Sequence, residues 1–263
     1  MLRVELIKQL LRVRSLVALA ALSAVPIIFG VATASEAGGR NGTQTGFYGA
    51  APFSALNHVA ASLEFTPLLL ALVVALLGSA LGAADRDWGT LRYLYVQPVS
   101  RHRLIAGKWS ALAVCCLLAV ACVVVAALLI GLIVFGWHPF HRIGTSNLSA
   151  FVASWRLLEA AGYLSVCMLS IGTIALALGL ILPGSAEALG ASIAFVIVAN
   201  IIDGRPSLRY LAALLPMHYW LRWTTLLDGG DARLATGLAV QVAAMAVALA
   251  IAYAILLRRD PAA

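Results

Sequence analysis

The sequence predicts an all-α integral membrane protein with six transmembrane helices. Hydrophobic residues make up 62% of the 263 positions and charged residues only 11%, far from the averages of soluble globular proteins. Apolar stretches also recur with the length that a helix needs to cross about 30 Å of hydrocarbon. The expected spans are residues 16–34, 65–84, 110–136, 157–182, 188–202 and 234–257. The fifth is short, but without it the basic C-terminus would lie outside, against the positive-inside rule.

Residues 1–15 carry a helical pattern that is not a span. Apolar side chains repeat at spacings of three and four, and polar side chains fill the other face. The apolar set is Leu6, Ile7, Leu10 and Leu11, and the polar set is Glu5, Lys8, Gln9 and Arg12. The pattern predicts a basic amphipathic helix lying along the inner membrane surface. A plain charged leader to the first span is the alternative.

The basic residues indicate how the chain crosses the membrane. Of eighteen lysines and arginines, eleven fall on segments that six crossings keep inside, and seven fall on longer outer loops. Both termini are therefore expected in the cytoplasm, and Leu56 in an outer loop. Pro183 and Gly184 are expected to break the chain between the fourth and fifth spans. An excess of arginine over lysine and abundant alanine hint at a GC-rich bacterial genome, and the expected location is a bacterial inner membrane.

The cysteines and histidines suggest no disulfide and no metal site. All the cysteines fall inside expected spans, where they behave as small apolar side chains. They are Cys115, Cys116, Cys122 and Cys167. His138 and His141 have a spacing that could share a metal ion, but no third ligand is evident nearby. We therefore expect both histidines to be solvated.

Charged residues at the ends of spans have local explanations. Arg156 and Glu159 lie three positions apart, which favours an ion pair on one helix face. Asn200 and Asp203 end the fifth span beside Gly204. They either line an outer vestibule or cap the helix, and capping is the favoured interpretation.

The loop at residues 85–108 has features that topology alone does not explain. Asp87 or Thr90 can cap a short helix that Pro98 ends. That helix would carry an apolar ridge of Leu91, Leu94 and Tyr95. A second helical turn, capped by Ser100, would carry Arg101, Arg103 and Lys108 toward the inner headgroups. An exposed apolar ridge flanked by charge is typical of a protein interface, whereas a merely basic topological loop is the alternative.

The order of residues in this loop is similar to one family. An acidic cluster, Gly-Thr-Leu, an aromatic turn, Pro-Val-Ser-Arg and Gly-Lys follow one another after the second span, as in permeases of the type-2 ABC exporter family. The resemblance implies a cytoplasmic coupling helix between spans two and three that docks onto a separate ATPase subunit. It also implies a second permease copy, with ATP and Mg held by the ATPase. The implied coupling residues are Asp85, Arg86, Asp87, Gly89, Thr90, Leu91, Leu94, Tyr95, Pro98, Ser100 and Arg101.

The same family has an external re-entrant hairpin before the last span, and residues 203–233 resemble it. The stretch is amphipathic and is interrupted at Pro216. Its aromatic residues are Tyr210, Tyr219, Trp220 and Trp223. An ordinary belt of interfacial aromatics would explain them equally well. We expect residues 1–263 to form a single transmembrane domain. It would include this region, the interfacial helix at 1–15 and the coupling loop at 85–108.

The chain carries no recognisable catalytic chemistry. Its Gly-Lys pair at Gly107 is followed by Trp109 and lacks the glycine that a phosphate-binding loop needs. No ladder of ionisable residues suggests transport driven by an ion gradient. The resemblance therefore implies a permease subunit for a hydrophobic or amphiphilic substrate, in a lipid bilayer and without nucleic acid. A structural or sensory membrane protein that recruits a non-ATPase partner is the alternative.

Overall fold

The computed structural model describes residues 6–7, 9, 12–39, 53–87, 101–141, 148–227 and 234–258. The side chains of residues 36–39, 85–87, 101 and 256–258 are not part of that description. Throughout these ranges the regular structure is helical, apart from one antiparallel bridge between Phe140 and Leu148. The elements in order are α2 (Val13–Gly39), α3 (Ala55–Phe65), α4 (Pro67–Asp87), α6 (Arg101–Val134), α7 (Ala150–Ile181), α8 (Ser185–Asp203), η1 (Pro206–Leu208), α9 (Arg209–Ala212), η2 (Pro216–Tyr219), α10 (Thr224–Leu227) and α11 (Leu234–Arg258).

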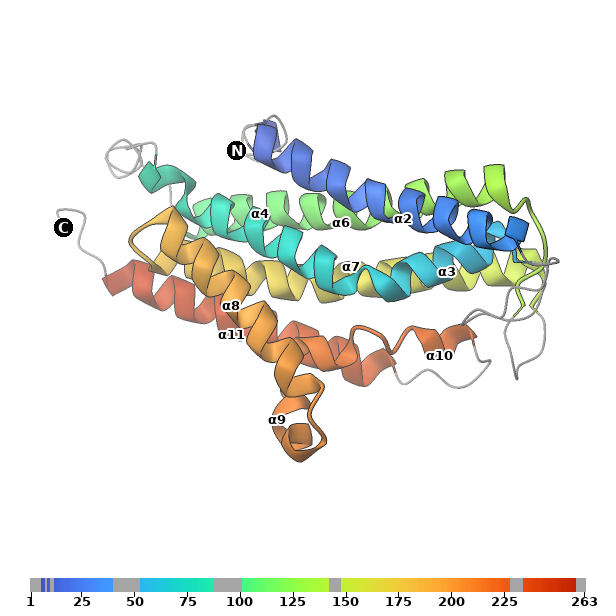
Figure 1. Cartoon of the computed structure of the whole chain (residues 1–263). Helices are drawn as coiled ribbons and strands as arrows, with labels where there is room; N and C mark the ends of the chain where they lie inside the picture. Colours follow the sequence, from blue (N-terminus) through green and yellow to red (C-terminus); the bar gives the residue numbers. More distant parts are fainter. Residues whose placement is uncertain are drawn as a thin grey trace.

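Six of these helices, α2, α4, α6, α7, α8 and α11, are long and apolar enough to cross a membrane. They correspond to the six predicted spans, and α7 and α8 separate at Pro183 and Gly184 as expected. Figure 1 shows them as an elongated bundle in which α8 runs obliquely to the others. The end of α4, the start of α6 and the end of α11 lie at the same end of the bundle, which we call the loop end (left in Figure 1).

The helices α4 and α7 form the centre of the bundle. In each, 72% of the most apolar stretch is buried, against 17% in α2 and α11. Their backbones approach closely because glycines face each other. A Cβ on Gly82 would lie 2.5 Å from the Leu176 carbonyl oxygen, and one on Gly179 would lie 2.6 Å from the Ser79 carbonyl oxygen. Small residues at such spacings let membrane helices pack by van der Waals contact.

The helix α3 was not predicted, and it corrects the expected position of Leu56. The first nine residues of α3 are buried, Leu56 included, so this segment is part of the core and not an exposed outer loop. Ser54 caps the helix by accepting a hydrogen bond from the backbone N–H of Asn57. The helix is too short to span a membrane, and it packs on α2, α4, α6 and α7.

An aromatic cluster around His58 joins α3 to α2. The imidazole stacks on Phe29, with ring centroids 5.5 Å apart, and also contacts the rings of Phe53 and Phe135. Its Nε2 lies 3.0 Å from the Pro26 carbonyl oxygen. Burial lowers the pKa of His58, because the protonated ring would lose its hydration. The neutral imidazole therefore suits this packing.

Candidate functional site

The two described ends of the predicted coupling loop lie at the loop end of the bundle. Residues 85–87 end α4 and Arg101 begins α6, so the two helices flank the loop as expected. The side chains of these four residues, and all of residues 88–100, lie outside the part of the chain that the structure describes. The apolar ridge and its docking role therefore stay predictions. The described residues show how the two flanking helices are fixed.

Lys108 lies inside the bundle rather than at the headgroups. Because α6 is continuous from Arg101, position 108 is about two turns into the helix. The side chain is 1% exposed, and its Nζ donates a hydrogen bond of 2.7 Å to the carbonyl oxygen of Leu81 on α4. This corrects the prediction that Lys108 points to the inner headgroups. A buried ammonium is costly and must be solvated by protein groups, so this side chain ties α6 to α4.

Gln9 reaches the same face of α4 from the N-terminal segment. Its Nε2 donates to the Leu77 carbonyl oxygen, 3.3 Å away, one helical turn before Leu81. The sequence placed Gln9 on the polar face of an interfacial helix, yet this side chain is buried. One strip of α4 thus accepts hydrogen bonds from two other parts of the chain.

The start of α6 also approaches the end of α11. The Tyr253 hydroxyl lies 3.5 Å from Nδ1 of His102, and their rings are 6.3 Å apart. Together with the Lys108 contact and the glycine packing of α4 on α7, this links the helices that flank the loop to the centre of the bundle. A displacement applied to the loop would therefore move α4, α6 and α7 together, because packed helices deform little.

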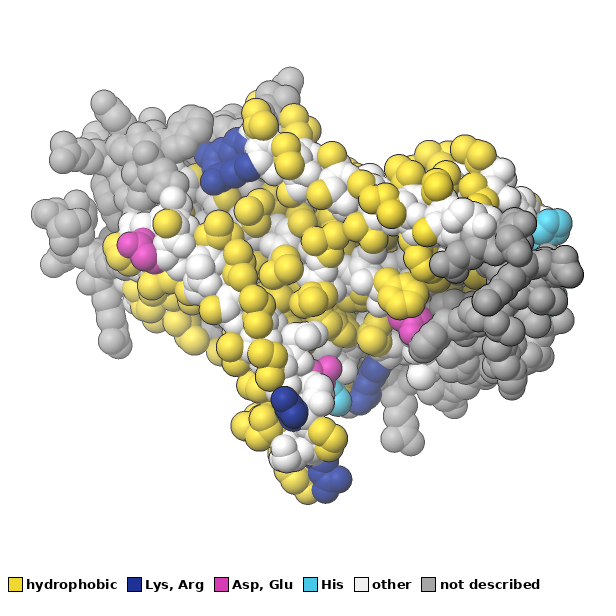
Figure 2. Space-filling view, viewed as in Figure 1, with side chains coloured by type: hydrophobic (Ala, Val, Ile, Leu, Met, Phe, Trp, Pro, Cys, Tyr) yellow, Lys and Arg dark blue, Asp and Glu magenta, His cyan; other side chains and the backbone are white. Residues whose placement is uncertain are grey.

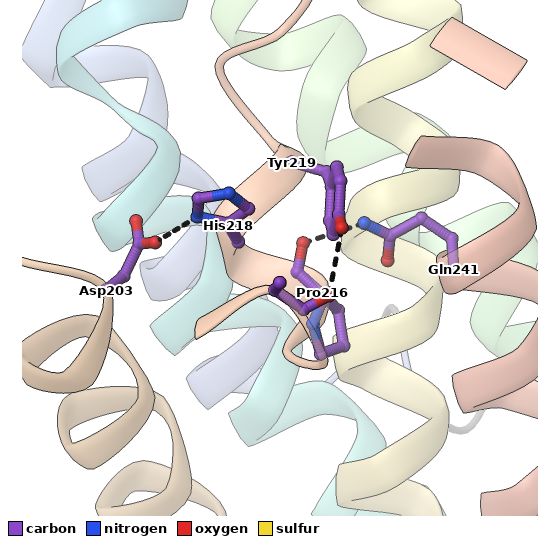
Figure 3. A network of polar contacts seen from close by, with 6 residues as sticks. Asp203, Pro216, His218, Tyr219 and Gln241 are labelled. Carbon is purple, nitrogen blue, oxygen red and sulfur yellow. Dashed lines mark hydrogen bonds and ion pairs between the residues drawn. The ribbon is translucent and has the colours of Figure 1, made fainter. Parts of the chain in front are cut away.

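A second polar cluster fixes the chain between α8 and α11 (Figure 3). Nδ1 of His218 in η2 lies 2.6 Å from Oδ1 of Asp203 at the end of α8. The sequence favoured Asp203 as a helix cap, and this is wrong for its side chain. The last turn of α8 is instead closed by the backbone N–H of Gly204, which donates to the Asn200 carbonyl oxygen. The carboxylate is free of the helix end and binds the following segment.

Tyr219 and Gln241 anchor that segment in the bundle. The Tyr163 hydroxyl of α7 donates to the Tyr219 carbonyl oxygen at 2.8 Å. The amide of Gln241 on α11 donates to the Pro216 carbonyl oxygen at 2.8 Å, as drawn in Figure 3, while its Oε1 accepts a hydrogen bond from Ser170. Two carbonyls of the broken segment thus accept hydrogen bonds from buried side chains, as irregular backbone inside a membrane protein requires.

The aromatic residues of this region are not all interfacial. Tyr219, Trp220 and Trp223 are buried against the bundle, and Trp223 is 0% exposed. Tyr210, in contrast, is 76% exposed. An ordinary aromatic belt therefore does not explain the first three, which pack as core residues. Whether the segment re-enters the membrane stays a prediction.

The expected ion pair between Arg156 and Glu159 does not form. Arg156 Nη1 donates instead to the Leu226 carbonyl oxygen of α10, 2.7 Å away, while Glu159 is exposed. The arginine finds a partly buried carbonyl because α10 packs on the start of α7, which sequence spacing does not reveal. Among the described residues, no group of three or more possible metal ligands occurs.

The cysteines lie on helices long and apolar enough to span a membrane, as predicted, with Cys115, Cys116 and Cys122 on α6 and Cys167 on α7. All of them are free, and Cys122 is the least buried of the set.

Comparison with known proteins gives the family. The sequence model described as ABC-2 family transporter protein matches residues 1–200. The chain belongs to this family. The match covers α2 to most of α8 and therefore includes the predicted coupling loop. With six apolar helices, an ABC-2 family member of this kind is a multi-pass membrane protein.

A curated relative is similar but unequal in length. The chain is 27% identical over 159 residues to the "Uncharacterized protein YhcI" of Bacillus subtilis (strain 168). The matched region covers 56% of this chain and 49% of that protein. The chain thus spans about half the length of the curated relative that it matches.

Proposed function

We propose that the chain is the permease subunit of an ATP-binding cassette exporter, forming the membrane path for a hydrophobic or amphiphilic substrate such as a drug, lipid or peptide. The observation that carries the proposal is the ABC-2 family match over residues 1–200. The family's architecture needs an ATPase on a separate chain, which agrees with the missing phosphate-binding motif in this sequence. ATP and Mg would be held there and not in this chain.

In the proposed complex, residues 85–108 dock onto the ATPase, and a second permease copy completes the path. The contact of Lys108 with α4 supports this role, because it joins the two helices beside the loop, and Gln9 ties the N-terminal segment to the same strip of α4. Closure of the ATPases would push the loop, and the packed helices would tilt between two arrangements. The protein would lie in a bacterial inner membrane with both termini in the cytoplasm.

The test is copurification of the tagged chain from its native membrane. We expect an ATP-binding cassette ATPase to copurify, and the isolated chain to hydrolyse no ATP while the complex does. A partner without a phosphate-binding loop would favour the structural or sensory alternative. Robust ATP hydrolysis by the isolated chain would end the proposal.

Variants of the loop test whether it couples. Leu94→Asp puts a charge into the predicted ridge, so the chain should insert normally but lose its ATPase. The double change Arg101→Ala with Arg103→Ala removes charge but keeps the ridge, and should weaken docking much less. Leu56 is unsuitable as a control because it is buried. Trp137, which is exposed just after α6, is the matched control, and Trp137→Asp should leave docking intact. Full ATPase binding by Leu94→Asp would refute the coupling role.

A further inference from the structure

Residues 205–214 project from the side of the bundle, and we call them the protruding arm. The arm follows α8 and contains η1 and α9, which Figure 1 shows standing away from the other helices. Its large apolar side chains are open to the surroundings, with Tyr210 76% and Leu214 75% exposed and Leu211 also exposed. Figure 2 shows hydrophobic and basic side chains together on this projection.

The exposed charges of the arm are arginines. Arg205 and Arg209 are both exposed and lie four positions apart. The Arg209 guanidinium donates to the Tyr210 hydroxyl at 2.9 Å and lies 4.9 Å from the centre of that ring, which holds it beside the aromatic surface. The sequence has no Asp or Glu from residue 204 to residue 227. Asp203, just before the arm, is already engaged by His218. The arm is therefore cationic and amphipathic.

The arm is held in place at its base. His218 binds Asp203 before the arm, and the next residue, Tyr219, donates from its hydroxyl to the Ala213 carbonyl oxygen at 2.9 Å (Figure 3 shows the His218 contact). Ala212 is buried beside these contacts. Two consecutive residues of η2 thus fix both ends of the arm. The exposed leucines and arginines are therefore already in place, and binding a partner does not have to order the arm first.

We propose that the protruding arm binds anionic phospholipid headgroups in the membrane leaflet next to the C-terminal end of α8. Exposed apolar side chains of α8, among them Val198 and Ile201, continue toward the arm and would suit contact with acyl chains. Leucines beside them enter the boundary between headgroups and acyl chains, as in other interfacial amphipathic segments. The two guanidinium groups bind phosphate oxygens, which they match better than an ammonium does.

A lipid surface suits the exposed face of the arm better than a second copy of the arm does. In a two-fold contact between two arms, Arg205 and Arg209 would meet a surface whose sequence has no acidic residue to offset their charge. A lipid surface instead supplies both an apolar layer and negative charge. The binding does not depend on which substrate the chain moves.

The experiment uses the full chain in lipid vesicles. The four native cysteines are replaced, Leu214→Cys carries an environment-sensitive fluorophore, and nitroxide-labelled lipids quench it. Nitroxide-labelled phosphatidylglycerol and phosphatidylcholine are compared at the same mole fraction. We expect severalfold stronger quenching by phosphatidylglycerol, since one arginine near an anionic surface shifts binding roughly fivefold. The preference should shrink in high salt.

Controls separate the arm's arginines from general lipid contact. A fluorophore at Val247→Cys, an exposed position of α11, should be quenched equally by both lipids. Adding Arg205→Gln and Arg209→Gln to the Leu214→Cys chain should remove the preference, and the matching lysine changes should keep part of it. Equal quenching of the unaltered arm by both lipids overturns the proposal. Quenching by neither lipid also overturns it, because the arm would then be covered by water or by a second copy. A preference for phosphatidylglycerol that survives the loss of both arginines overturns it as well.

Discussion

The α4–α7 contact is held by glycines, whereas the connection between α8 and α11 is held by side chains that bind backbone carbonyls. At the first, Gly82 and Gly179 let two helical backbones touch, and specificity comes from volume. At the second, Tyr163 and Gln241 reach into a broken segment and supply the donors that its carbonyls need. The comparison teaches that a membrane protein can fix regular helices by shape alone but needs polar side chains wherever its backbone is irregular.

The largest effect is expected at the glycine contact. Gly82→Leu would force a side chain against the backbone of α7, where even a Cβ lies 2.7 Å from Gly179 Cα. We expect loss of well-folded protein, or a fall in unfolding free energy of about 3 kcal/mol or more. The measurement is the yield of monodisperse protein and its thermal unfolding. Gly162→Leu, where nothing lies within 4 Å, is the control. Equal behaviour of the two variants would contradict volume as the basis of this contact.

A reversal of charge at Lys108 should be nearly as damaging. Lys108→Glu puts a carboxylate where the Leu81 carbonyl oxygen now accepts a hydrogen bond, so two acceptors would meet in a buried site. The expected destabilisation is about 3–5 kcal/mol, measured by denaturant unfolding in mild detergent. Arg103→Glu on the same helix, at an exposed position, should change stability by less than about 0.5 kcal/mol. Tolerance of Lys108→Glu would show that the ammonium does not bind α4.

Loss of one hydroxyl tests the hydrogen-bonded region. Tyr163→Phe removes the donor to the Tyr219 carbonyl oxygen but keeps the ring, so the carbonyl is left buried without this partner. We expect a loss of about 1 kcal/mol, read from the thermal unfolding of the purified chain. Tyr210→Phe, at the exposed ring of the protruding arm, should have a smaller effect. If both variants unfold like the unaltered chain, the Tyr163 hydroxyl does not stabilise the segment.

The smallest effect concerns pH and the aromatic cluster of α3. Because burial lowers the pKa of His58, the unfolded chain binds its proton more readily than the folded chain. The stability that the neutral His58 side chain contributes to the folded chain is therefore fully present above the ordinary histidine pKa of about 6.5. It is lost as the pH falls below that value. Thermal unfolding measured from pH 8 to pH 5 should show this loss. His58→Phe should reduce the slope of stability against pH, and an unchanged slope would contradict a neutral buried imidazole.

The sequence by itself determined the class of protein and the number of spans. These follow from composition and from stretch length, which are local properties, since any helix that crosses hydrocarbon must be long and apolar. The break at Pro183 and Gly184 was equally local, because proline lacks the backbone donor that a continuous helix needs. The resemblance of the coupling loop to the family was also present in the order of residues along the chain.

Only the tertiary structure decided which polar groups are buried and what they bind. Lys108 was expected at the headgroups because its charge is favourable there, yet its helix carries it to the Leu81 carbonyl oxygen. Asp203 was expected to cap its own helix, yet it binds His218, which lies fifteen residues away. Leu56 was expected in an outer loop, yet it is buried in α3, which packs on α2, α4, α6 and α7. The physical reason is common to all three: composition determines whether a segment prefers lipid or water, but the partner of each side chain depends on which helix faces pack together.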